Sequence, residues 1–199
     1  MPTPRPYISF SQMTLFEMNP QKYVEQYIYG KKQRITRNMA YGSLMADGLE
    51  NDESTGDPVL DMMMAKIPKF EIRDKSFEVD LKDGKSKITL LCKPDTMKAD
   101  MTAFKEYKTS VRPWTQKMAD ESGQVTFYAT GMWLKTKKIP QDIELIDVVI
   151  EYNEDGSLIP TGEIKTFKTK RTMVDIIKMT GRIKRAWAGI NKLCEKELL

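Results

Sequence analysis

The sequence contains no histidine, and this absence removes whole classes of chemistry. Neither a Ser-His-Asp nor a Cys-His mechanism is available, and a metal site cannot use imidazole ligands. The two cysteines, Cys92 and Cys194, lie far apart and belong to no Cys-x-x-Cys pair. A disulfide framework, a zinc ribbon and an iron–sulfur ligand set are therefore excluded. An enzyme of this composition has to work with carboxylates, lysine, tyrosine or a bound metal.

Long apolar runs are also absent. Because no stretch of about 18 apolar residues occurs, we expect no membrane span. The N-terminal Met-Pro-Thr-Pro-Arg-Pro lacks the apolar run of a signal peptide, which favours a cytoplasmic location. The 199 residues, 40% of them hydrophobic, suffice for one domain with a substantial core. The net charge of +4 permits an anionic partner without requiring one.

The hydrophobic pattern predicts an α/β fold. Helical patterns fill the first third of the chain, and the alternation typical of half-buried strands begins at Lys69. Asp83-Gly84 predicts a hairpin turn, so the three strands of this region are expected to form an antiparallel meander. The remaining elements are a helix over 122–135, strands over 143–152 and 159–168, and a long helix opened by the Thr172-x-x-Asp175 capping box. The order αβββαβ predicts one central mixed sheet flanked by helices.

Three charged residues on neighbouring strands form the candidate site. Asp95 lies near the end of one strand, and Glu106 and Lys108 are two apart on the next, so they share a face. A turn near Ala99 and Asp100 would place Asp95 roughly opposite Glu106. Two carboxylates and an ammonium would then converge, which suits a hard divalent cation with a lysine beside it. The alternative is an ordinary solvated charge pattern.

The helix over 122–135 adds two polar groups. Gln124 and Tyr128 are four residues apart and therefore lie on one face, which Gly131 and Lys135 extend. A glutamine and a tyrosine on a helix directly after such a hairpin are a rarer combination than the hairpin alone. The alternative is that Tyr128 is a half-buried core tyrosine and Gln124 a surface residue.

Together these residues resemble the PD-(D/E)XK nuclease superfamily, in particular its RecB-like exonuclease branch, which includes CRISPR-associated RecB-type and phage nucleases. Lys93-Pro94-Asp95 matches the second motif of the family, and Glu106-Tyr107-Lys108-Thr109-Ser110 matches the third. Gln124-x-x-x-Tyr128 matches the motif that marks the branch. The helical entry is matched by Ser9-Phe10-Ser11 with Asn19-Pro20-x-x-Tyr23, and the helix with the first motif by residues 42–50. Each segment alone is weak evidence for the family, but the combination of all of them is specific to it.

The resemblance implies a restriction-endonuclease-like core within a single nuclease domain. That domain would cover residues 1–199. Its parts would be a helical entry over 1–38, a catalytic core over 39–152, and a strand with a basic helix over 153–199.

The sequence departs from the family pattern in two places. Asn19 stands where a cysteine often precedes the proline, and no cysteine cluster lies near the C-terminus, so no iron–sulfur cluster is expected. Ala46 stands where the first-motif helix often carries a metal-binding histidine. Glu50 is the candidate acid in its place, with Asp47, one helical turn earlier, as the alternative.

The resemblance also implies hydrolysis of a phosphodiester with Mg²⁺ or Mn²⁺. Asp95, Glu106 and the backbone carbonyl of Tyr107 would bind the ion, which polarises the phosphate and lowers the pKa of a bound water. Lys108 would orient that water and stabilise negative charge in the transition state.

Further residues are expected to contact DNA. Gln124 would hold the catalytic elements or contact DNA, Tyr128 would contact the substrate backbone or stack, and Lys135 extends their face. Trp114, in the preceding loop, would either stack on a base or be buried. Five cations at helical spacing form one stripe on the last helix: Lys178, Arg182, Arg185, Lys192 and Lys196. A basic stripe suits nucleic-acid phosphates, and an ordinary solvated helix face is the alternative.

The leading hypothesis is a metal-dependent DNA nuclease, an exonuclease or end-processing enzyme of phage or bacterial recombination or repair. It would act on single-stranded DNA or duplex ends in a bacterial cell or phage-infected host, away from membranes. One alternative is a nucleic-acid-binding module of the same fold with weak or lost catalysis. Another is a nuclease subunit that needs a helicase or recombination partner.

Overall fold

The computed structural model describes residues 5–197; residues 1–4 and 198–199 of the predicted domain lie outside the described residues. The helices are α1 (Phe10–Met18), α2 (Pro20–Tyr23), the π-helical turn η1 (Val24–Ile28), α3 (Arg37–Asn51), α4 (Pro58–Met64), α5 (Gln116–Asp120), α6 (Gly123–Thr136) and α7 (Met173–Glu197). The strands are β1 (Ile8–Ser9), β2 (Ile72–Arg73), β3 (Phe77–Asp83), β4 (Ser86–Cys92), β5 (Thr96–Met97), β6 (Ala103–Ser110), β7 (Asp142–Tyr152) and β8 (Leu158–Thr169).

The strands form two sheets, and the prediction of one central sheet is wrong in this respect. One sheet has the order β1-β4-β3 and the other the order β2-β5-β6-β7-β8. The predicted meander breaks at Lys93-Pro94, because proline has no N–H to donate to a ladder. Strand β4 therefore ends at Cys92, and the chain crosses to the second sheet before β5 begins at Thr96. Both sheets are mixed, because β1 and β4 are parallel and so are β6 and β7.

Side-chain caps determine where several helices begin. The Ser9 hydroxyl accepts a hydrogen bond from the Gln12 amide at 3.3 Å, and the Asn19 side chain accepts one from the Lys22 amide at 2.9 Å. Thr115 caps α5 in the same way. This short helix lies in the loop that precedes the helix predicted over 122–135.

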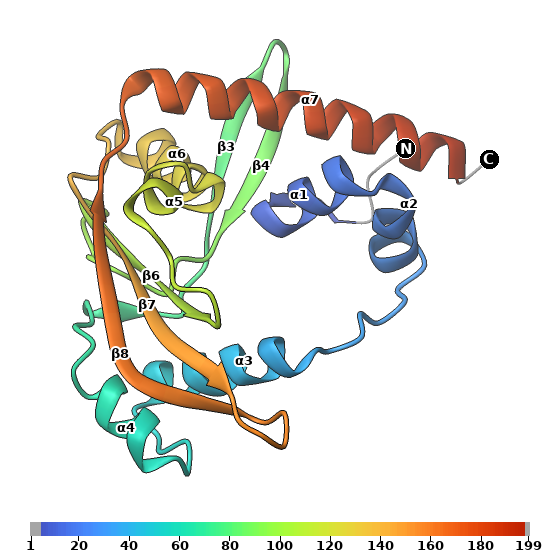
Figure 1. Cartoon of the computed structure of the whole chain (residues 1–199). Coiled ribbons are helices and arrows are strands. Elements are labelled where there is room, and N and C mark those ends of the chain that lie inside the picture. The colour runs from blue at the N-terminus through green and yellow to red at the C-terminus, as the bar shows by residue number, and fades with distance from the viewer. Residues whose placement is uncertain (1–4, 198–199) are drawn as a thin grey trace.

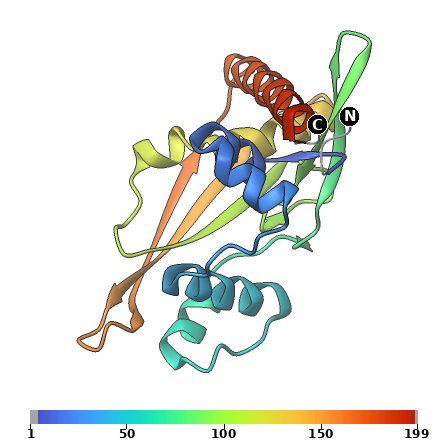
Figure 2. The same ribbon diagram turned by 90° about the vertical axis from the view of Figure 1, so that its right-hand side faces the viewer.

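Helices cover the sheets on two sides. In Figure 1, α7 runs along the top beside α1 and α6, and α3 lies at the bottom below β6 and β7. Figure 2 shows the β3–β4 hairpin projecting past α7. One hydrophobic cluster joins both sheets to α1, α6 and α7, and a second lies between α3, α4, β7 and β8. A Cβ on Gly131 would lie 2.4 Å from the Cys92 sulfur, so glycine permits the close approach of α6 to β4.

Membrane insertion through a helix has no support in this fold. Within residues 5–197, no helix combines the length and the apolar character that crossing a bilayer requires.

Candidate active site

The register of β5 and β6 brings the two predicted carboxylates together. Thr96 pairs with Lys105 and Met97 with Phe104 in antiparallel fashion, which places Asp95 opposite Glu106. Asp95 is then fixed by β6 itself, because its Oδ2 atom accepts a hydrogen bond of 2.5 Å from the Tyr107 amide. The geometry predicted for these two residues from the turn is thus present.

Glu106 and Lys108 form a buried ion pair. The Lys108 ammonium lies 2.6 Å from Glu106 Oε1, and the Glu106 side chain is only 3% exposed. Burial raises the pKa of Glu106 to about 8, against the opposing effect of Lys108. Burial also raises the pKa of Asp95. Both pKa shifts have the same physical cause, because removal from water disfavours the charged form of a carboxyl group.

A hydrogen-bonded chain extends this pair onto α6. Lys108 donates to Gln124 Oε1 at 2.9 Å, and Gln124 Nε2 donates to the Tyr128 hydroxyl at 3.1 Å. The Tyr128 ring packs edge-on against Phe104 and Phe127, each with its centroid 6.2 Å away. Because the ring is buried in the core, the hydroxyl is the part of Tyr128 that can face a substrate. The i, i+4 spacing on α6 therefore delivers two polar groups to one continuous network.

The donor set fits a hard divalent cation. Glu106 Oε2 is buried and accepts no hydrogen bond, so a strong acceptor remains unsatisfied next to Asp95. The N–H and C=O of a strand residue face the same side, so the Tyr107 carbonyl is directed toward Asp95 together with its amide. Carboxylate and carbonyl oxygens are the ligands that Mg²⁺ and Mn²⁺ prefer. In the described part of the chain, no group of three or more His, Cys, Asp or Glu side chains is arranged to hold a metal ion.

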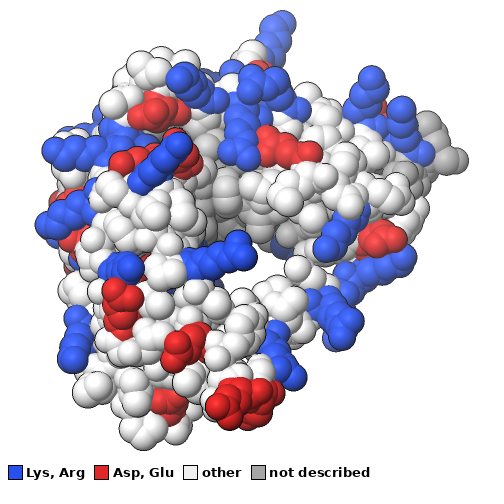
Figure 3. Space-filling model, viewed as in Figure 1, with Lys and Arg blue, Asp and Glu red and all other residues white. Residues whose placement is uncertain are grey.

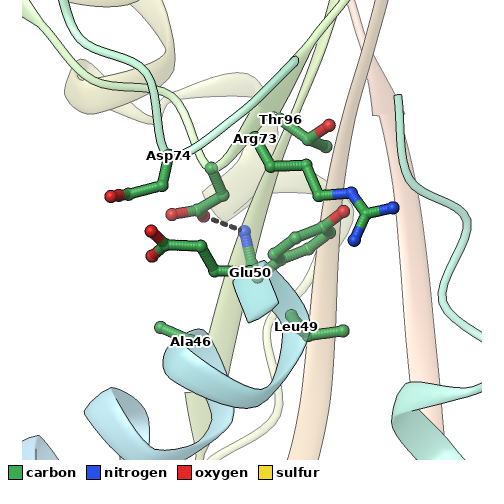
Figure 4. A pocket seen from close by; sticks show the side chains of 8 residues that line it. Ala46, Leu49, Glu50, Arg73, Asp74 and Thr96 are labelled. Carbon is green, nitrogen blue, oxygen red and sulfur yellow. Dashed lines mark hydrogen bonds between the residues drawn. The ribbon is translucent and has the colours of Figure 1, made fainter. Parts of the chain in front are cut away.

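A cavity of about 30 Å³ adjoins Asp95, which is enough room for a water molecule. Glu50, Asp74 and Ala46 line it, so the predicted acid of α3 does reach this region, whereas Asp47 is not among the lining residues. In Figure 4 the carboxylates of Glu50 and Asp74 lie on one side and the guanidinium of Arg73 on the other. A hydrogen bond to Asp74 raises the pKa of Glu50.

Sequence reasoning missed Asp74. Its amide donates to the Asp95 carbonyl at 3.2 Å, and its carboxylate forms an ion pair with Lys93. The residue has a φ of 46°, a left-handed conformation that aspartate tolerates better than most residues. In the sequence it is one of several polar residues between two strands, so no pattern distinguishes it.

Asp147 is the second residue missed, and here a signal existed. It is fully buried in the stretch 145–150 of β7, where it is the one charged residue among apolar ones, and a carboxylate in such a run requires partners. Asp147 accepts hydrogen bonds of 2.8 Å from the Ser110 hydroxyl and the Trp114 amide. It thereby fixes the loop that leaves β6 just beyond Lys108.

The predicted DNA-binding residues lie in different places. Lys135 is exposed, but it lies eleven residues beyond Gln124 on α6, or about 16 Å along the helix axis. Trp114 is half-buried and packs against the main core.

On helix α7, Arg182 makes three hydrogen bonds to Glu17, the shortest 2.6 Å, and so joins α7 to α1. The exposed members of the stripe are Lys178, Arg185, Lys192 and Lys196. Figure 3 shows Lys and Arg side chains gathered along the α7 edge of the molecule.

Solved structures share this architecture. A candidate exonuclease from Eubacterium rectale matches with a TM-score of 0.59 and 12% identity, over 94% of this chain and 82% of that one. A phage-related exonuclease from Haemophilus somnus 129PT matches with a TM-score of 0.56 and 14% identity, over 94% and 83%. No family model and no curated protein matches the sequence. The α/β fold with its restriction-endonuclease-like core is therefore confirmed, at a level of identity that shows the fold alone.

Proposed function

We propose that the protein is a metal-dependent DNA nuclease of the RecB-like PD-(D/E)XK type, which acts at strand ends as an exonuclease or end-processing enzyme in phage or bacterial recombination or repair. The observation that carries the proposal is the hydrogen-bonded chain of Glu106, Lys108, Gln124 and Tyr128. Asp95 is held opposite Glu106 by the Tyr107 amide. The five residues come from strand β6, helix α6 and the segment directly before β5. The two exonuclease structures of the same fold support the same function.

Asp95, Glu106 and the Tyr107 carbonyl would hold Mg²⁺ or Mn²⁺, with Glu50 as an additional acid. When bound, the ion supplies Lewis acidity at the phosphate and lowers the pKa of its water. The unsatisfied Glu106 Oε2 is the atom of this chain that most requires such a partner.

Lys108 contributes a directed hydrogen bond and a positive charge. Its ammonium has three donors, of which Glu106 and Gln124 accept two. The third is free to hold an attacking water or a phosphate oxygen, and the charge favours the negative transition state. The Tyr128 hydroxyl accepts from Gln124 and keeps its own proton to donate toward the substrate.

The test is degradation of end-labelled single- and double-stranded DNA with each metal, alongside Mn²⁺ titration by calorimetry. We expect Asp95→Asn to abolish both activity and metal binding, and Lys108→Met to lower activity strongly while leaving metal binding intact. Cleavage at the wild-type rate in both variants would remove this site from the mechanism.

A second candidate function is a nucleic-acid-binding module without catalysis. Ala46, at the position where the related nucleases often carry histidine, favours it. A protein that binds DNA but gives no heat with Mn²⁺ would establish this alternative in place of the nuclease.

A further inference from the structure

The segment between β6 and α6 determines whether two groups of the site meet. Lys108 lies two residues before the end of β6, and Gln124 is the second residue of α6. Their contact of 2.9 Å therefore depends on the path of residues 111–122, here called the connection. The connection runs through helix α5, and most of its residues are exposed or half-buried. Because so little of it lies in the core, its path has to be fixed by specific anchors.

A carboxylate from the neighbouring strand anchors the first turn of the connection. Asp147 of β7 is fully buried. The Ser110 hydroxyl lies 2.8 Å from each oxygen of this carboxylate, and the Trp114 amide donates to one of them at 2.8 Å. The last residue of β6 and the fourth residue of the connection are thus tied to one side chain. The direction in which the chain leaves β6 is therefore set by β7.

The same carboxylate is the neighbour of Lys108 across the sheet. In the parallel ladder of β6 and β7, Lys108 pairs with Asp147. Paired residues present their side chains on the same face, and Ser110, two residues beyond Lys108, shares that face. Asp147 therefore lies beside the lysine and also holds the strand directly after it.

A carboxylate at this place in the fold is costly. Burial raises the pKa of Asp147, against the opposing hydrogen bonds from the Trp114 amide and the Ser110 hydroxyl. Carboxylates in apolar surroundings destabilise a fold unless hydrogen bonds compensate them. An apolar side chain would suit residues 145–150 of β7 better, but it would leave the connection without its anchor.

The far end of the connection has an anchor of its own. Arg171 is buried, and its guanidinium donates to the carbonyls of Ala119 and Ser122 at 3.0 and 3.2 Å. Its Nε atom also donates to the Thr126 hydroxyl on α6 at 2.7 Å. The start of α6, with Gln124, is thus fixed separately from the end of β6. The carboxylate of β7 is the anchor on the lysine side.

We propose that Asp147 is a positioning residue of the nuclease site, which holds the end of β6 so that Lys108 stays in contact with Gln124. This inference rests on the proposed function and adds a residue that lies outside the matched motifs. Asp147 acts through Ser110, Trp114 and Lys108, and not by contact with the substrate.

Nuclear magnetic resonance tests this role without requiring catalysis. The side-chain amide signals of Gln124 are identified in ¹⁵N-labelled protein by their loss in Gln124→Ala. We expect Asp147→Ala to shift these signals. The control is Asp120→Ala, which removes another carboxylate of the connection, one that accepts from the Thr169 hydroxyl at 2.7 Å and from Gln116 at 3.0 Å. Unchanged Gln124 signals in Asp147→Ala, or an equal shift in the control, would overturn the proposal whether or not the protein cleaves DNA.

A milder variant covers the case in which Asp147→Ala does not fold. Ser110→Ala keeps the buried carboxylate with its bond from the Trp114 amide and removes only the hydroxyl donor. The Gln124 signals should move in the same direction as in Asp147→Ala, but less far. Signals at their wild-type positions in Ser110→Ala would count against the anchor.

Kinetics then show whether the anchor serves catalysis. Asp147→Ala should lower kcat roughly 10- to 100-fold, the range expected for loss of the contact between Lys108 and Gln124, with little change in KM. In a Gln124→Ala background the same substitution should lower kcat by less than about 2-fold, because the contact is already lost. A purely structural role would give independent effects that multiply. Such multiplication in an active nuclease would overturn the proposal and leave the nuclease assignment in place.

Discussion

The Lys108 ammonium lies 2.9 Å from the amide oxygen of Gln124, sixteen positions further along the chain. This contact couples strand β6 to helix α6 at the centre of the site. The position of the lysine therefore depends on the packing of α6 as well as on the strand that carries it.

Replacing Lys108 by methionine tests the role of its charge. We expect the cleavage rate to fall by about 10²- to 10³-fold, as for loss of one preorganised group that stabilises transition-state charge. The measurement is the initial rate on end-labelled single-stranded DNA. The control is Lys85→Met in the β3–β4 turn, which should leave the rate unchanged, and a comparable loss there would point to general electrostatic binding.

The network predicts graded effects on α6. Gln124→Ala removes a hydrogen bond to a charged group, worth about 1.5–3 kcal/mol, so kcat should fall roughly 10- to 100-fold. Tyr128→Phe removes only the terminal hydroxyl and a neutral hydrogen bond, so its effect should stay within about 10-fold. Steady-state kinetics on a single-stranded substrate separate kcat from KM. The reverse order of effects would contradict a chain that runs from Lys108 outward.

Asp52 should make stability depend on pH in the acid range. It forms ion pairs with Lys69 and Arg73, and hydrogen bonds from these two residues lower the pKa of Asp52 to about 2. A depressed carboxyl pKa contributes stability above the unfolded value, about 3.9, and this contribution is lost as the pH falls through 2. The denaturation midpoint of the wild type should therefore fall more steeply between pH 4 and 2 than that of Asp52→Asn.

Asparagine is a suitable replacement at this position. Asp52 has a φ of 57° at the end of α3, a conformation that asparagine also adopts readily. The substitution therefore removes the charge with little change in backbone preference. Parallel pH profiles for the two proteins would show that the ion pairs do not contribute.

Two glycines in helices should respond in opposite ways to alanine. In Gly131→Ala the new Cβ would lie 2.4 Å from the Cys92 sulfur, so we expect a loss of about 1–3 kcal/mol from overpacking. In Gly181→Ala the nearest atom is the end of the Arg185 side chain at 3.4 Å, so helix propensity should add up to about 1 kcal/mol. Urea unfolding measures both, and rescue of Gly131→Ala by Cys92→Ala would identify the clash as the cause.

Local periodicity was sufficient to predict much of the site. The two-residue period of β6 placed Glu106 and Lys108 on one face, and the helical period of α6 placed Gln124 beside Tyr128. The turn between β5 and β6 was short enough that its position determined the pairing of Asp95. These contacts depend on neighbours within about thirty residues, where spacing translates directly into geometry.

Other features depend on contacts that spacing does not encode. Asp74 reaches the site through a left-handed backbone conformation. Arg182 forms hydrogen bonds with Glu17, which lies 165 positions away in the chain. The break in the strand at Pro94, in contrast, could have been predicted from the sequence, because a proline inside a predicted strand argues against a continuous ladder. Lys178, Arg185, Lys192 and Trp114 remain predictions for DNA contact.

The crossing at Lys93-Pro94 has a consequence for assembly of the site. Strand β4 belongs to one sheet and β5 to the other, and Asp95 follows directly after the crossing. Because the chain has left the first sheet before Asp95, its carboxylate meets Glu106 through the β5–β6 pairing within the second sheet alone. The acidic pair therefore needs only the β5–β6 hairpin, whereas the contact of Lys108 with Gln124 also needs helix α6 to be packed on β6.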